Sequence, residues 1–276
     1  MSGGYSIDEL VVDLAGHVKD GDSFHYPFGI HLYIPEFLTN IGITKYIVVE
    51  FAVAIAMCAV FIPLAVKIKG GKPIKGRFWN MIELLLVFLK DQVIVPSIGK
   101  KHAAPFVPYL WTLFFFVLFC NLAGMVPWSG TPTGSLSVTT VLALSTFGVV
   151  IVTGMRLHGV KGYWLGLIPS VDVHPAMAVF LKPLLFGIEV AGLIIKHGVL
   201  AIRLMANMFA GHLSLAVFMS FIPLSAGIIY VWVLVTPASI AMSVALSMLE
   251  LLIAFLQAYV ITFLSSLFIG MSVHQH

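Results

Sequence analysis

Two apolar runs in the second half of the chain, residues 176–222 and 227–270, limit what it can fold into. At about 1.5 Å per residue, a helix over the first run would be about 70 Å long, more than twice the hydrocarbon thickness of about 30 Å. Neither run alternates as barrel strands do. Both therefore predict membrane helices that tilt steeply or break, joined as a hairpin by the turn between them.

Three earlier runs have ordinary spanning length: 46–66, and a hairpin at 109–155 made of 109–126 and 135–155. Only 10% of the residues are charged, against about 25% in a soluble domain. Segment 78–98 holds Glu83, Lys90 and Asp91, and is too charged to span. We expect an all-α membrane protein with five transmembrane helices plus an interfacial amphipathic helix, the last two helices forming the long, steeply tilted hairpin.

The charge distribution predicts the topology. Residues 67–101 carry eight basic and two acidic side chains, which indicates a cytoplasmic loop. The N-terminus is then outside and the C-terminus cytoplasmic, with 1–45 as an N-terminal surface segment containing a possible short helix at 7–18, and 46–276 as the membrane domain. Basic residues lie beside spans, so no nucleic-acid partner is expected. The two cysteines lie in apolar runs, so we expect no disulfide framework, metal or cofactor.

Arg203 is the most informative single residue. It follows Glu189 and Lys196 at intervals of seven, and Asn207 comes four later, so the four share one helix face. An arginine at membrane depth costs at least about 2.5 kcal/mol and does not lose its proton. It is either functional or snorkelling toward the interface, and Glu189 and Lys196 are either functional or a structural pair.

The last run repeats the pattern: Thr236, Ser243, Glu250 and Gln257 recur every seven residues, with Ser247 beside them. Ser243 and Ser247 are interpreted as structural polar groups. Asn121, within the second span, is interpreted in the same way, as a helix-to-helix hydrogen bond, with a functional contact as the alternative.

Three sequences resemble those of a known family. RLMANMFAGH at 203–212, LQAY at 256–259 after Glu250, and FCNLAGMVPW at 119–128 are similar to subunit a, the membrane-embedded stator channel of F-type ATP synthases. Met205 and Ala206 depart from its usual Phe and Gly. The extra methyl group at Ala206 predicts a small repacking.

The resemblance implies two offset proton half-channels facing a rotating ring of carboxylates, with Arg203 as the gate between them. The outer half-channel would contain Asn207, His212, Glu250 and Gln257. Glu189 would belong to the inner one, with His174 and Lys196 as possible exit residues. Implied partners are the c-ring, peripheral stalk subunit b, other ATP synthase subunits and the lipid bilayer. The implied location is a bacterial inner membrane.

Other functions are compatible with an intramembrane arginine. A secondary transporter would bind an anionic substrate there, but its expected inverted repeat is not evident. A scaffold would leave Glu189, Arg203 and Glu250 unexplained. The chain has no Gly-rich phosphate loop, so ATP chemistry is expected on other subunits and this chain is expected to be non-catalytic.

Overall fold

The computed structural model describes residues 23–26, 30–33, 44–69, 76–126, 131–167, 175–225 and 227–274. The chain divides into two compact units. Unit 1 combines residues 1–65, 115–138 and 204–258, and unit 2 combines 66–114, 139–203 and 259–276. The possible helix at 7–18 and His174 lie outside the described residues.

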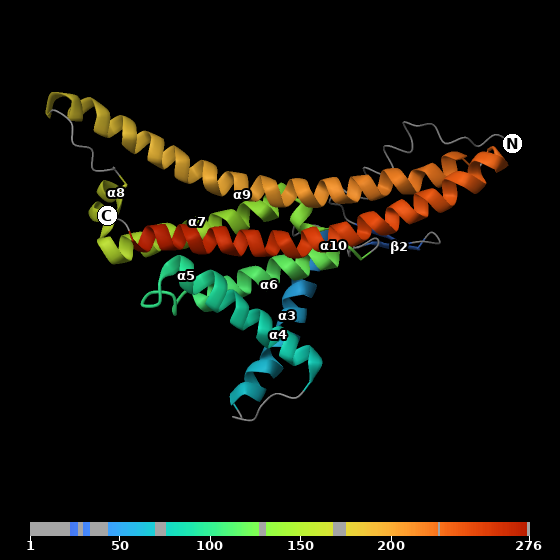
Figure 1. Ribbon diagram of the computed structural model, residues 1–276, viewed down its shortest axis with the longest axis horizontal. Helices are drawn as coiled ribbons and strands as arrows, with labels where there is room; N and C mark the ends of the chain where they lie inside the picture. Colours follow the sequence, from blue (N-terminus) through green and yellow to red (C-terminus); the bar gives the residue numbers. More distant parts are fainter. Residues whose placement is uncertain are drawn as a thin grey trace. The chain divides into compact units, whose positions relative to one another are not determined.

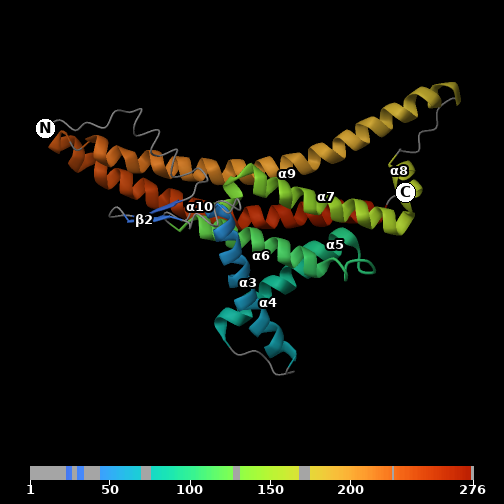
Figure 2. The same cartoon turned by 180° about the vertical axis from the view of Figure 1, so that it is seen from behind.

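The described residues include five helices that are long and apolar enough to cross a membrane. They are α3 (Lys45–Lys69), α6 (Val107–Gly124), α7 (Leu136–His158), α9 (Pro175–Ser225) and α10 (Ile229–Val273). The last two contain 51 and 45 residues. The prediction of an all-α membrane protein whose last two helices are long is confirmed. Within unit 1, the end of α9 runs beside the start of α10 in both views (Figures 1 and 2).

The segment predicted as an interfacial helix, 78–98, is helical but not uniformly α-helical. It consists of α4 (Arg77–Phe88), a π-helical segment η2 (Leu89–Ile94) and α5 (Val95–Ile98). Pro96 has no N–H to donate, and its ring crowds the carbonyl four residues earlier, which favours wider π spacing there. Leu89, Val93 and Ile94 are fully buried, so one side of the segment packs inside the protein.

Two small elements were not predicted. Strands β1 (Ser23–Tyr26) and β2 (Ile30–Tyr33) pair as an antiparallel hairpin, with Ser23 opposite Tyr33. A short helix, α8 (Val160–Gly166), starts after Gly159, whose φ of 74° lies in the region that favours glycine. Both elements are too short to give a clear hydrophobic period in the sequence.

In unit 1, α3 packs against α6. Val49 and Val53 of α3 form a buried cluster with Cys120 of α6. The rings of Phe61 and Phe115 meet edge to face at 4.8 Å between centroids. Cys120 therefore serves as a small hydrophobic side chain in this core, as its position in an apolar run predicted.

In unit 2, the last turns of α10 pack closely against α5 and α7. A Cβ atom at Gly270 would overlap the backbone carbonyl oxygen of Ser97, so only glycine permits this approach. Ser272 links α10 to α7, because its hydroxyl donates to the carbonyl oxygen of Val150 at 2.8 Å.

Candidate functional site

The polar stripe of α10 faces the interior of unit 1. Ser243, Glu250 and Gln257 are 9%, 4% and 1% exposed. A spacing of seven residues is about two helical turns, so these side chains share the buried face while apolar neighbours point outward. Four polar atoms of the stripe have no hydrogen-bond partner among the described residues: Thr236 Oγ1, Ser243 Oγ, Glu250 Oε1 and Gln257 Nε2. The fifth member, Ser247, donates to the Ser243 carbonyl at 2.9 Å.

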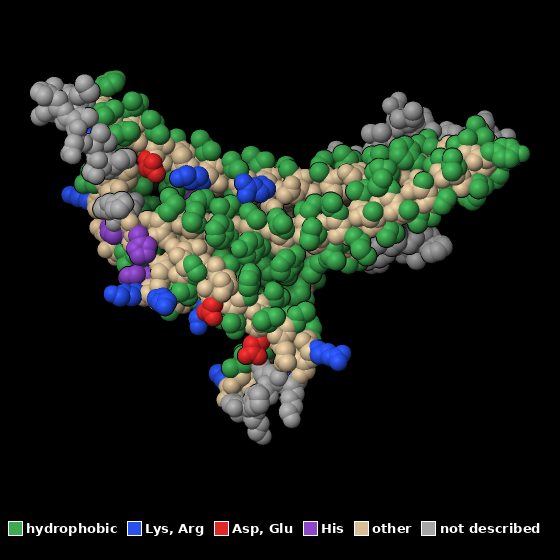
Figure 3. Space-filling model, viewed as in Figure 1, with side chains coloured by type: hydrophobic (Ala, Val, Ile, Leu, Met, Phe, Trp, Pro, Cys, Tyr) green, Lys and Arg blue, Asp and Glu red, His purple; other side chains and the backbone are tan. Residues whose placement is uncertain are grey.

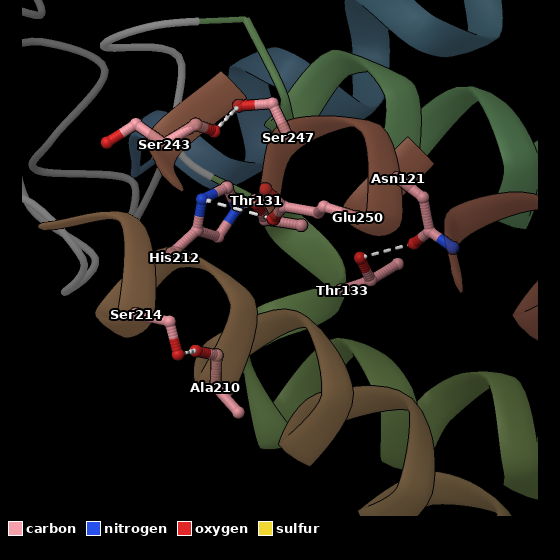
Figure 4. Close-up of polar contacts among 9 residues, drawn as sticks. All are labelled: Asn121, Thr131, Thr133, Ala210, His212, Ser214, Ser243, Ser247 and Glu250. Atoms are coloured by element: carbon pink, nitrogen blue, oxygen red, sulfur yellow. Dashed lines mark hydrogen bonds and ion pairs between the residues drawn. The ribbon is translucent and has the colours of Figure 1, made fainter. Parts of the chain in front are cut away.

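His212 and Glu250 come together across the α9–α10 hairpin. Nδ1 of His212 lies 3.5 Å from Oε1 of Glu250, close enough for an ion pair when the ring is protonated but longer than a typical hydrogen bond. The other ring nitrogen, Nε2, is hydrogen-bonded to the hydroxyl of Thr131. The three side chains converge in Figure 4. An imidazole and a carboxylate in this arrangement are able to exchange a proton.

Gly211 allows α9 to approach the Glu250 carboxyl group. A Cβ atom at this position would lie 2.9 Å from Oε1 of Glu250 and 3.2 Å from its Cδ. Such distances are shorter than ordinary van der Waals contact, so a side chain at 211 would displace the carboxyl group. The residue before His212 thus helps to set where Glu250 lies.

Asn207 and Gln257 form a second link between the same two helices. Nδ2 of Asn207 donates to Oε1 of Gln257 at 3.0 Å. Asn207 is exposed, whereas Gln257 is buried. This bond joins a side chain at the protein surface to the buried stripe.

A small cavity of about 210 Å³ adjoins both links. Its lining includes Asn207, Gly211, Ser214 and Glu250, with apolar side chains making up the rest. Water needs a site with polar partners, and this one offers an amide, a hydroxyl and a carboxyl group. The cavity is therefore suited to hold water next to Glu250.

The turn after α6 supplies side chains that the sequence did not indicate. Thr133, in the short helix η3 (Pro132–Gly134), donates to Oδ1 of Asn121 at 2.7 Å. Asn121 in turn donates from Nδ2 to the Ala254 carbonyl of α10 at 3.1 Å. These bonds fix the turn that carries Thr131 (Figure 4). The available signal was a pair of hydroxyls flanking a proline in TPTG, which is too common in turns to identify a site.

Unit 2 contains a larger cavity of about 470 Å³. Glu189 and Lys196 both line it, together with Tyr163, Ser272 and His274. Burial raises the pKa of Tyr163, and a hydrogen bond between its side chain and that of Ser272 partly opposes this, so the phenol remains neutral. The structure thus brings Glu189 and Lys196 to one cavity, and neither forms an ion pair with another described residue.

Arg203 lies well inside α9, and its side chain is exposed. No described residue forms an ion pair or hydrogen bond with its guanidinium. Figure 3 shows basic side chains standing among hydrophobic ones along α9. The exposed charge is therefore available to a group outside the described chain.

His197 is the other titratable group on this part of α9. It is 4% exposed, and its ring packs between Phe147 and Phe268, with centroids 5.1 and 4.8 Å away. Its Nδ1–H donates to the Leu193 carbonyl at 2.9 Å. These contacts describe a core histidine. In the described part of the chain, no three His, Cys, Asp or Glu side chains are grouped so that they could hold a metal ion.

Comparison with known proteins gives a consistent result. A family model described as ATP synthase A chain matches residues 47–270. The ATP synthase subunit a of Myxococcus xanthus (strain DK1622) is 39% identical over 244 residues, covering 86% of this chain and 76% of the relative. That of Chloroherpeton thalassium (strain ATCC 35110 / GB-78) is 36% identical over 275 residues, covering 96% and 78%. That of Anaeromyxobacter sp. (strain Fw109-5) is 40% identical over 237 residues, covering 84% and 55%.

Proposed function

The chain belongs to the ATP synthase subunit a family, and from this premise we propose that it provides two offset proton half-channels with Arg203 between them. It is a multi-pass membrane subunit that assembles with other ATP synthase subunits. Protons would enter one half-channel, travel on the carboxylates of a rotating c-ring, and leave through the other. Proton flow would drive the rotation that is coupled to ATP synthesis, and the ATP chemistry would take place on other subunits.

The outer half-channel is proposed to run along Asn207, His212, Glu250 and Gln257. The support is the 3.5 Å approach of His212 to Glu250 and the adjoining cavity of about 210 Å³. A carboxyl group and an imidazole exchange protons readily when their environment brings their proton affinities close together. The Asn207–Gln257 bond would then guide water or a proton carrier from the buried stripe to the surface of α9.

The inner half-channel is proposed to include the unit 2 cavity. Its support is that Glu189 and Lys196 both line a cavity large enough for several water molecules. Glu189 would accept the departing proton. The positive charge of Lys196 would then favour the ionised form of Glu189 and so the release of that proton. His174 remains a proposed exit residue. Ser243, Ser247 and Asn121 are proposed to support the helices.

Arg203 carries the proposal: its guanidinium is exposed on a span-length apolar helix and is unpaired among the described residues. A cation at membrane depth that no partner neutralises is expensive, so we infer that it is retained for a function. A c-ring carboxylate passing Arg203 would be held in its ionised form and release its proton. Because arginine does not deprotonate, it would also block direct passage of protons between the half-channels.

The proposed setting is a bacterial inner membrane, with the N-terminus outside and the C-terminus in the cytoplasm. Residues 1–45 would lie at the membrane surface and 46–276 would form the membrane domain, with 78–98 in the interface. The proposed direct partners are the c-ring and peripheral stalk subunit b. The alternative, a secondary transporter that binds an anion at Arg203, would work without a ring.

The test uses the whole ATP synthase in lipid vesicles. Arg203→Lys should abolish ATP-driven proton pumping even though the charge is kept, because lysine sheds its proton and presents a compact ammonium instead of a planar guanidinium. Lys182→Arg, at an exposed position of the same helix, is the control and should retain pumping. Normal pumping by Arg203→Lys would refute the gate. Proton or anion transport by the purified chain alone would favour the transporter.

A further inference from the structure

Thr131 lies where it controls which nitrogen of His212 faces Glu250. The threonine is 3% exposed, and its hydroxyl is hydrogen-bonded to Nε2 of His212. The opposite ring nitrogen, Nδ1, is the one 3.5 Å from Oε1 of Glu250. The ring is therefore held at one edge while its other edge meets the carboxyl group (Figure 4).

We propose that Thr131 is a positioning residue for proton transfer between His212 and Glu250. The inference rests on the proposed outer half-channel and adds a residue to it. In the transfer, the Nδ1 proton of protonated His212 passes to ionised Glu250, giving a neutral carboxylic acid and a neutral imidazole. That imidazole keeps its Nε2 proton and forms a hydrogen bond through it to Thr131 Oγ1. Nδ1 is then free to take the next proton.

A hydroxyl suits this position because it serves either form of the ring. It accepts a hydrogen bond from Nε2–H when the ring is charged or is the neutral tautomer with its proton on Nε2. When Nε2 carries no proton, the hydroxyl rotates and donates to it. Carbonyl oxygens only accept, and amide or ammonium N–H groups only donate. The bond to the protonated ring is the stronger of the two, since a charged donor strengthens a hydrogen bond.

The turn that bears Thr131 is fixed independently of His212. Thr133, two residues later, is tied to Asn121, and through it to α10. On the other side, a Cβ atom at Gly124 would overlap the Thr131 side chain, so glycine leaves room for it. The contact with His212 is thus set by α6 and its turn.

Among the described residues, few charged groups lie near His212. Glu250 is the titratable group that faces it from α10, and the turn contributes the neutral hydroxyl of Thr131. The sequence of α6 has no charged side chain, and α9 has none after Arg203. A change in the pH dependence of proton flow on altering Thr131 therefore reports on His212 and Glu250.

The experiment measures ATP-driven proton pumping by the whole ATP synthase between about pH 6 and pH 9. Thr131→Val keeps the shape but removes the hydroxyl. It should slow pumping about tenfold, the effect of one hydrogen bond, and shift the pH–rate curve toward lower pH because the protonated ring loses more. Thr131→Ser should restore both rate and curve. Thr112→Val, which removes a hydroxyl that bonds only the Pro108 carbonyl of its own helix α6, should keep the wild-type curve.

Gly124→Ala provides a second variant if Thr131→Val assembles poorly, because it displaces Thr131 while keeping its hydroxyl, and it should shift the curve the same way. A wild-type curve for either variant, or an equal shift for Thr112→Val, would overturn the role of Thr131. Glu250→Gln is measured in parallel. If it pumps normally, the outer half-channel itself fails; if it is impaired while Thr131→Val is not, only the positioning role fails.

Discussion

Replacing Gly211 by alanine should impair proton flow while leaving the protein folded. The new Cβ atom would lie 2.9 Å from Glu250 Oε1, where ordinary contact starts at 3.4 Å, so the oxygen must retreat by about half an ångström. Misplacing a reacting group by 1 Å costs about a hundredfold in rate, so half that distance predicts a loss of about tenfold. The moved atoms end a flexible side chain, and alanine gains about 0.5–1 kcal/mol over glycine in a helix, so stability should change little.

The assay is passive proton conduction through the membrane sector in vesicles, driven by an imposed potential. Gly198→Ala is the matched control: it makes the same substitution in α9, but its Cβ atom would meet nothing within 4 Å. The control should conduct as the wild type does. Equal rates for the two variants, at equal amounts of assembled complex, would show that the close approach of Gly211 does not set the position of Glu250.

Two further predictions test other contacts. Glu250→Gln keeps the shape of the side chain but removes the exchangeable carboxyl proton, so conduction should fall about a hundredfold, the usual effect of losing an acid–base group; wild-type conduction at all pH values would contradict this. Gly270→Ala places a Cβ atom against the Ser97 carbonyl, which is backbone and yields poorly, so the free energy of unfolding should fall by about 1–3 kcal/mol. Thermal unfolding in detergent, with Gly192→Ala as the control in open space, measures it; an equal Tm for both would argue against close packing at Gly270.

The sequence was sufficient for the spans because membrane helices are specified by length and hydrophobicity alone. It also predicted that the polar residues of α10 share one helix face, since they are spaced by seven, and the structure buries that face at Glu250 and Gln257. The sequence did not predict which residues contact that face. Nothing local in the sequence connects Thr131 to a histidine 81 positions later, because that contact depends on how α6 and its turn pack.

Local chemistry also explains where segment 78–98 departs from a uniform α-helix. A hydrophobic period predicts that a helix exists, but the π-helical segment Leu89–Ile94 arises from a single proline just beyond it. Pro96 was visible in the sequence, yet its effect could have been a kink, a break or a change of helical spacing. Which of these occurs is decided by the buried neighbours of the segment.

The four orphaned polar atoms along α10 have a consequence for the order of events in assembly. Each costs about 1–3 kcal/mol if it stays dry, and the described chain satisfies none of them. We therefore expect water to bind along this face as soon as the hairpin forms, at Thr236, Ser243, Glu250 and Gln257. On the function proposed above, this water would be in place before the c-ring docks.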